Sequence, residues 1–192
     1  GRAYPSPSLL GPATHRLECL PMRAVFFDMD DTLLEPRHPS PLITFKTKWG
    51  LPLDRLVIEG VRSYPEAQQP IILEEFRNME LALSQAARLR AGIEDLLSAL
   101  REQGLYTAII TNNHRASTAM VLAKHRLCFD LVLTREDGKP KPAPDLLLRA
   151  LEHFGLEKHQ AIFVGDSWAD QQAAQQAGLR AFFLATPDNA DL

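Results

Sequence analysis

The chain has 192 residues, 45% of them hydrophobic and 23% charged, which is typical of a globular protein with one domain or a domain and a small insert. Its 21 Lys and Arg residues against 24 Asp and Glu residues give a net charge of −3, which argues against a nucleic-acid-binding protein. No apolar run is long enough to span a membrane, and Cys19 and Cys128 form no CxxC pair, so we expect no membrane insertion, no disulfide framework and a cytoplasmic location.

The first part of the chain divides into a tail, a strand and an insert. Residues 1–21 contain four prolines and no apolar periodicity, so we expect a disordered or extended tail. The apolar run Ala24–Asp28 predicts the first strand. Residues 35–88 show no strand pattern, but apolar residues recur at helical spacing between Ile72 and Leu83. We therefore predict a helical cap over 35–88.

The rest of the chain alternates strand patterns with helix patterns. Four further short apolar runs predict strands at 106–111, 131–134, 161–165 and 181–184. Their residues are apolar at consecutive positions, as expected for parallel strands that helices cover on both faces. The sequence thus predicts an α/β fold whose core consists of residues 22–34 and 89–186, with the cap inserted after the first strand.

Acidic residues follow the first predicted strand directly. Asp28, Asp30 and Asp31 crowd their charges at the strand end, which is costly unless a cation or a shared proton offsets the repulsion. The crowding therefore suggests a divalent metal site. The alternative is a solvated Asp-rich turn, and for Asp31 a turn position in contact with solvent is what we expect.

A second polar group follows the strand predicted at 106–111. Thr111, Asn112 and Asn113 precede a helix that begins near His114, and the free N–H groups at a helix start can bind phosphate. The alternative is that Asn112 or Asn113 only caps the helix, and we expect His114 to be a surface residue.

Two further segments carry charged residues between a strand and a helix. Prolines flank Lys141, so its ammonium group is held on a stiff loop, although both Lys139 and Lys141 could simply be solvated. Asp166 follows a glycine at the end of the strand 161–165, where a metal ligand would be useful. Ser167 and Asp170 have the spacing of a helix capping box, which could account for Asp170 alone.

Together these segments resemble the signatures of the haloacid dehalogenase superfamily, whose members are mostly phosphatases. The four matching motifs occur in the family's order: Asp28-x-Asp30-x-Thr32, Thr111, Lys141-Pro142-x-Pro144 and Gly165-Asp166-x-x-x-Asp170. The resemblance implies a Rossmann-like parallel sheet with a small helical cap, similar to that of phosphoglycolate phosphatases and β-phosphoglucomutases.

The resemblance also implies a reaction. Asp28 would attack the phosphorus atom of a phosphomonoester and form an aspartyl-phosphate, while Asp30 would serve as general acid and then as general base. Mg²⁺ would be held by Asp28, the main-chain carbonyl of Asp30 and Asp166.

Other residues would bind the phosphate group of the substrate. Thr111 and the amide of Asn112 would hold its oxygens, Lys141 would offset negative charge, and Asp170 would orient Lys141 or a metal-bound water. The implied partner is a small phosphorylated metabolite, and the oligomeric state stays open. A phosphosugar mutase and a non-catalytic binding protein on the same fold are the alternatives.

The cap would determine which substrate is accepted. Five of its residues could contact a substrate group, although we expect a solvated or packing role for each more often than a substrate contact: Lys46, Lys48, Trp49, Arg55 and Arg62.

Overall fold

The computed structural model describes residues 21–186, so most of the predicted tail lies outside the described residues. The sheet contains five parallel strands in the order β3-β2-β1-β4-β5. The strands are β1 (Ala24–Phe27), β2 (Tyr106–Ile110), β3 (Leu131–Leu133), β4 (Ala161–Gly165) and β5 (Arg180–Phe183). Every predicted strand overlaps an observed one, and the predicted parallel α/β fold is confirmed.

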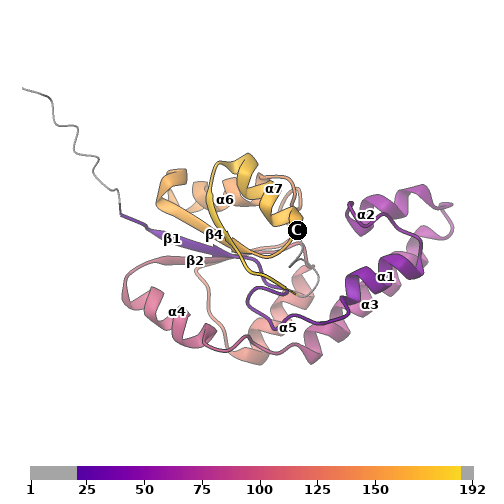
Figure 1. Cartoon of the computed structure of the whole chain (residues 1–192), viewed down its shortest axis with the longest axis horizontal. Helices are drawn as coiled ribbons and strands as arrows, with labels where there is room; N and C mark the ends of the chain where they lie inside the picture. The colour runs from indigo at the N-terminus through magenta and orange to yellow at the C-terminus, as the bar shows by residue number, and fades with distance from the viewer. Residues whose placement is uncertain (1–20, 187–192) are drawn as a thin grey trace, which may run out of the picture.

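Helices cover both faces of the sheet (Figure 1). On one face lie α4 (Ile93–Glu102) and α5 (Arg115–His125), and on the other lie α6 (Asp145–Phe154) and α7 (Trp168–Ala177). A short 3₁₀ helix, η2 (Lys158–Gln160), precedes β4. Alternate residues of the central strand β1 point into the two apolar layers. The consecutive apolar pattern in the sequence therefore follows from burial on both sides.

A group of helices between β1 and α4 forms the cap, by which we mean residues 35–88. It contains α1 (Pro41–Lys48), α2 (Val57–Gly60), the 3₁₀ helix η1 (Val61–Ser63) and α3 (Gln69–Ala86). These helices extend away from the sheet (Figure 1). They share an apolar cluster of their own, built on Phe45, Leu51, Val57, Val61, Ile72 and Phe76. The helix α3 includes the whole apolar repeat that the sequence showed.

The two chain segments that join the cap to the sheet lie side by side. Leu34 and Leu89 form an antiparallel bridge, and the N–H of Glu35 donates to the carbonyl of Arg88 at 2.9 Å. The division of the chain into core and cap at these two residues stays a prediction from the sequence. Within residues 21–186 no helix is long and apolar enough to cross a membrane.

Candidate active site

The carboxyl edge of the sheet gathers residues from three predicted motifs. Asp28 follows β1, Thr111 follows β2 and Asp166 follows β4, and β1 pairs with both of the other strands. A cavity of about 260 Å³ lies between this edge and the cap. Six of the seven predicted site residues line it, namely Asp28, Asp30, Thr111, Asn112, Lys141 and Asp166.

Lys141 lies at the centre of the site and is only 2% exposed. Its Nζ donates to Asp28 Oδ1 at 2.6 Å, to Asp170 Oδ1 at 2.5 Å and to the carbonyl of Ile110 at 2.8 Å. Burial alone lowers the pKa of Lys141, but the charges of Asp170 and Asp28 outweigh burial and raise that pKa above its ordinary value. Lys141 therefore carries a fixed positive charge beside Asp28, which excludes the solvated alternative.

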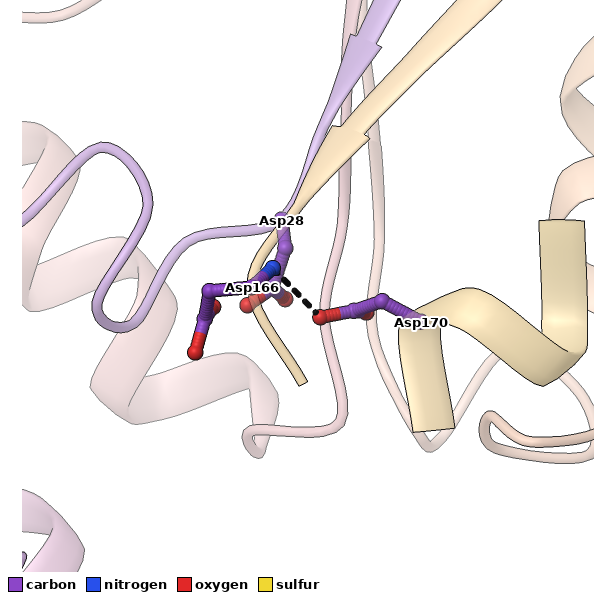
Figure 2. A group of neighbouring side chains, drawn as sticks. All are labelled: Asp28, Asp166 and Asp170. Carbon is purple, nitrogen blue, oxygen red and sulfur yellow. Dashed lines mark hydrogen bonds between the residues drawn. The ribbon is translucent and has the colours of Figure 1, made fainter. Parts of the chain in front are cut away.

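Asp170 is the seventh predicted residue, and it contacts two residues of the cavity wall, Asp166 and Lys141, without lining the cavity itself. It is fully buried, and its Oδ2 accepts hydrogen bonds from the N–H groups of Asp166 and Ser167 and from the hydroxyl of Ser167. Figure 2 shows the bond to Asp166, 3.1 Å long. The capping box is thus present, and the same carboxylate also binds Lys141. One oxygen of Asp170 thus orients Asp166 and Ser167, and the other orients Lys141.

Gly165 is required where the chain turns towards Asp170. A Cβ atom at this position would lie 2.7 Å from the Cβ and Cγ atoms of Asp170, closer than carbon atoms can approach. A larger residue would therefore displace Asp170 and, with it, the hydrogen bonds that orient Asp166 and Lys141.

Oxygen atoms of Asp28, Asp166 and Asp170 lie within 4.8 Å of one another (Figure 2). Both oxygens of Asp170 already accept hydrogen bonds, so Asp28 and Asp166 are the two carboxylates of this group that best suit a cation. Burial and the charge of Asp170 raise the pKa of Asp166 to about 7, and burial also raises the pKa of Asp28 well above its usual range. The carboxylates of Asp28 and Asp166 are hard oxygen donors, and a cation between them would offset the repulsion of their charges. Such a pair of donors suits Mg²⁺.

The raised pKa of Asp166 predicts how stability depends on pH in metal-free buffer. In the folded state the carboxyl group of Asp166 keeps its proton up to about pH 7, whereas in the unfolded chain it loses the proton near pH 3.8. The free energy of unfolding therefore falls as the pH rises from 3.8 to about 7. We expect a loss of about 2 kcal/mol, roughly half the full linkage because the side chain is partly exposed.

Chemical denaturation in EDTA at pH 5 and pH 8 measures about two thirds of this loss, because the comparison covers only the part of the change between pH 5 and about pH 7. Asp166→Asn removes the proton-binding group without changing its size, so its stability should decline less than that of the wild type. An equal decline in both proteins would contradict the assignment.

Asp30 is held by a residue that the sequence did not predict as part of the site. Asn113 Nδ2 donates to Asp30 Oδ2 at 3.0 Å. Asp30 is accessible to solvent, but its surroundings beneath the cap desolvate it and raise its pKa to about 6, against the effect of the bond from Asn113. The alternative that Asn112 or Asn113 caps the next helix is wrong, because the ring of His114 caps α5. His114 is also buried, at 3% exposure, and is not the surface residue that we expected.

Asn112 joins the second and third motifs through its side chain. Its Nδ2 donates to the carbonyl of Lys141 at 2.7 Å, and its Oδ1 accepts from the N–H of Lys141 at 2.8 Å. The side-chain amide is therefore occupied, and the main-chain N–H is the part of Asn112 that suits a phosphate oxygen. The hydroxyl of Thr111, at the cavity wall, accepts from the N–H of Asn113 at 3.1 Å and can still donate.

Two of the five cap candidates, Lys46 and Arg55, line the cavity. Lys46 is buried, and its Nζ donates to two backbone carbonyls of the cap at 3.0 and 2.7 Å, so it packs the cap. Arg55 is exposed and offers a cation to the cavity. Lys48, Trp49 and Arg62 are not part of the cavity wall.

The family model described as haloacid dehalogenase-like hydrolase matches residues 41–184. The chain belongs to this family. A phosphoglycolate phosphatase of Nitrosospira multiformis is 31% identical over 189 residues, covering 85% of this chain and 83% of that protein. A putative pyrophosphatase of Caldanaerobacter subterraneus is 29% identical, covering 82% and 79%. The predicted family and its hydrolase class are confirmed.

Solved structures of haloacid dehalogenase-like proteins share the fold. A subfamily IA hydrolase of Geobacter sulfurreducens has a TM-score of 0.61 at 25% identity, covering 86% of this chain and 91% of that one. A haloacid dehalogenase-like hydrolase of Bacteroides fragilis, described as putative, has a TM-score of 0.70 at 20% identity, covering 88% and 91%.

Proposed function

We propose that the chain is a Mg²⁺-dependent phosphatase that hydrolyses a small phosphomonoester through an aspartyl-phosphate on Asp28. The main support is the buried ammonium group of Lys141, which lies 2.6 Å from Asp28 at the wall of the cavity. A carboxylate can attack a negatively charged phosphate only where fixed positive charge reduces the repulsion between them. Lys141 supplies such charge beside the nucleophile.

In the first proposed step, a carboxylate oxygen of Asp28 forms a bond to phosphorus, and the bond from phosphorus to the ester oxygen breaks. Asp30 donates its proton to the departing alkoxide. In the second step, Asp30 takes a proton from a water molecule, whose oxygen attacks phosphorus and releases inorganic phosphate and free Asp28. A pKa of about 6 lets Asp30 give and accept a proton near neutral pH.

The remaining residues bind and orient the phosphate group. Thr111 and the main-chain N–H of Asn112 would hold its oxygens, with Lys141 beside them. When bound by Asp28, the Asp30 carbonyl and Asp166, Mg²⁺ supplies positive charge to the phosphoryl oxygens. Thr32 keeps Asp166 in place by donating from its hydroxyl to Asp166 Oδ1 at 2.9 Å.

Phosphoglycolate is the first substrate to test. The relatives of this chain include several phosphoglycolate phosphatases, and a two-carbon acid is small compared with a cavity of about 260 Å³. Arg55 offers a cation that suits the carboxylate of such a substrate. A cytoplasmic location stays a prediction from the sequence.

Release of inorganic phosphate from phosphoglycolate and from p-nitrophenyl phosphate tests the proposal. We expect turnover with Mg²⁺ and a loss of at least about 100-fold in EDTA, since the crowded acids then repel the substrate. Isomerisation of a hexose phosphate primed by a bisphosphate, with little phosphate release, would instead favour the mutase. Absence of both reactions would favour a binding protein.

A further inference from the structure

A largely buried ion pair joins the cap to the sheet at the wall of the cavity. Arg135 follows β3, and Glu80 lies on the cap helix α3. The guanidinium nitrogens Nη1 and Nη2 donate to Glu80 Oε1 at 2.5 Å and Oε2 at 2.8 Å. Glu80 is only 7% exposed, and both residues line the cavity. The pair is therefore a planar, two-bond contact between two parts of the molecule that are 55 residues apart in sequence.

Arg135 also contacts the phosphate-binding loop, by which we mean Thr111–Asn113. Its Nη1 donates to the carbonyl of Asn112 at 3.1 Å, and its main-chain N–H donates to the carbonyl of Asn113 at 3.4 Å. The guanidinium group also lies 5.5 Å from the ring centre of Phe76, on the same helix as Glu80. One side chain thus connects the cap helix with a loop whose three residues line the cavity.

The energetics of this contact depend on the position of the cap. With the cap in place, the two charges neutralise each other in a desolvated environment, and removing one partner leaves the other buried without compensation. If α3 moved away from the sheet, Arg135 would lose Glu80, and its guanidinium group would be free to turn away from the carbonyl of Asn112. Displacement of the cap would therefore disturb the phosphate-binding loop.

We propose that Glu80 and Arg135 are positioning residues that couple closure of the cap to the placement of the phosphate-binding loop. The proposal rests on the proposed phosphatase function. It assigns to the pair an effect on the chemical step, because the loop reaches its working position only when α3 holds Arg135. An ion pair that only stabilised the fold would not link closure of the cap to the position of the phosphate-binding loop.

Steady-state kinetics of Glu80→Gln and Arg135→Met with Mg²⁺ give the first test. We expect each change to lower kcat about 30-fold and to raise KM by a smaller factor, because the misplaced loop both binds the phosphate group less well and aligns it poorly during the reaction. The double variant should be no slower than the slower single variant, since both changes remove one contact. If Arg135→Met does not fold, Arg135→Lys replaces it, because lysine keeps the charge but cannot make the planar contact.

Hydrogen exchange with inorganic phosphate and Mg²⁺ as the probe gives the second test. In the wild type, the probe should slow exchange both in the phosphate-binding loop and in α3. In the variants, it should still protect the loop, but no longer α3. If Glu80 and Arg135 only stabilised the fold, the probe would still slow exchange in α3 of the variants.

Glu75→Gln is the matched control, since it breaks the exposed pair of Glu75 with Lys48, 2.5 Å apart on the cap. Its kcat should match that of the wild type. Wild-type kcat in Glu80→Gln, additive losses in the double variant, or retained protection of α3 would each overturn the coupling while leaving the phosphatase proposal intact. A wild type with neither turnover nor protection by the probe would overturn both.

Discussion

Replacement of Asp28 by asparagine is expected to reduce phosphate release by at least about 10⁴-fold, to the background of the assay. Asparagine has the same shape, but its amide cannot form the covalent bond to phosphorus on which the proposed reaction depends. The fold should persist, because Lys141 keeps its bonds to Asp170 and the Ile110 carbonyl. Since burial disfavours the charge of Asp28, the metal-free variant should unfold at the same temperature as the wild type or a higher one.

Asp31→Asn is the matched control for this experiment. Asp31 is an adjacent acid with a left-handed backbone at φ 55°, a conformation that asparagine also tolerates. We expect its turnover to stay within a few fold of the wild type. Substantial turnover by Asp28→Asn with Mg²⁺ would remove Asp28 from the role of nucleophile.

Replacement of Lys141 by methionine is expected to damage both activity and stability. Activity should fall about 10³-fold, because the cation beside the nucleophile is lost. In metal-free buffer at pH 8, the free energy of unfolding should fall by about 3 kcal/mol, because Asp28 and Asp170 then lack their buried partner. The loss should be smaller at pH 5, where the acids can take up protons instead.

Lys139→Met provides the comparison, because Lys139 lies on the same loop and is exposed. Its kinetics and denaturation curve should overlay those of the wild type. If both substitutions had equal effects, activity and stability would depend on the loop as a whole and not on the buried ammonium group of Lys141.

The sheet and most of the site could be predicted because their signals are local. Each strand is a continuous apolar run, and the predicted residues Asp28, Thr111 and Asp166 each follow such a run directly. Parallel pairing then brings strand ends together at one edge without further information. The burial of Lys141 could not be predicted in this way, because Lys141 lies on a loop that could equally have left it in solvent. Only the structure shows that it is buried.

The residues that sequence reasoning missed depend on contacts between distant segments. Asn113 orients Asp30 across 83 positions, and Glu80 meets Arg135 across 55, so no spacing in the sequence reports either pair. His114 was missed for another reason, since histidine is an uncommon cap and its burial depends on how α5 packs.

The bridge between Leu34 and Leu89 has a consequence for how such a protein can diversify. The chain enters and leaves the cap at one point, so the rest of the fold places no demand on the length of what lies between. Doubling an insert closed in this way costs only about 0.6 kcal/mol of loop-closure entropy. Grafting a different helical segment between these two leucines would change the chemistry above the cavity, and it would leave the catalytic edge unaltered only where the new segment supplied Arg135 with a partner in place of Glu80.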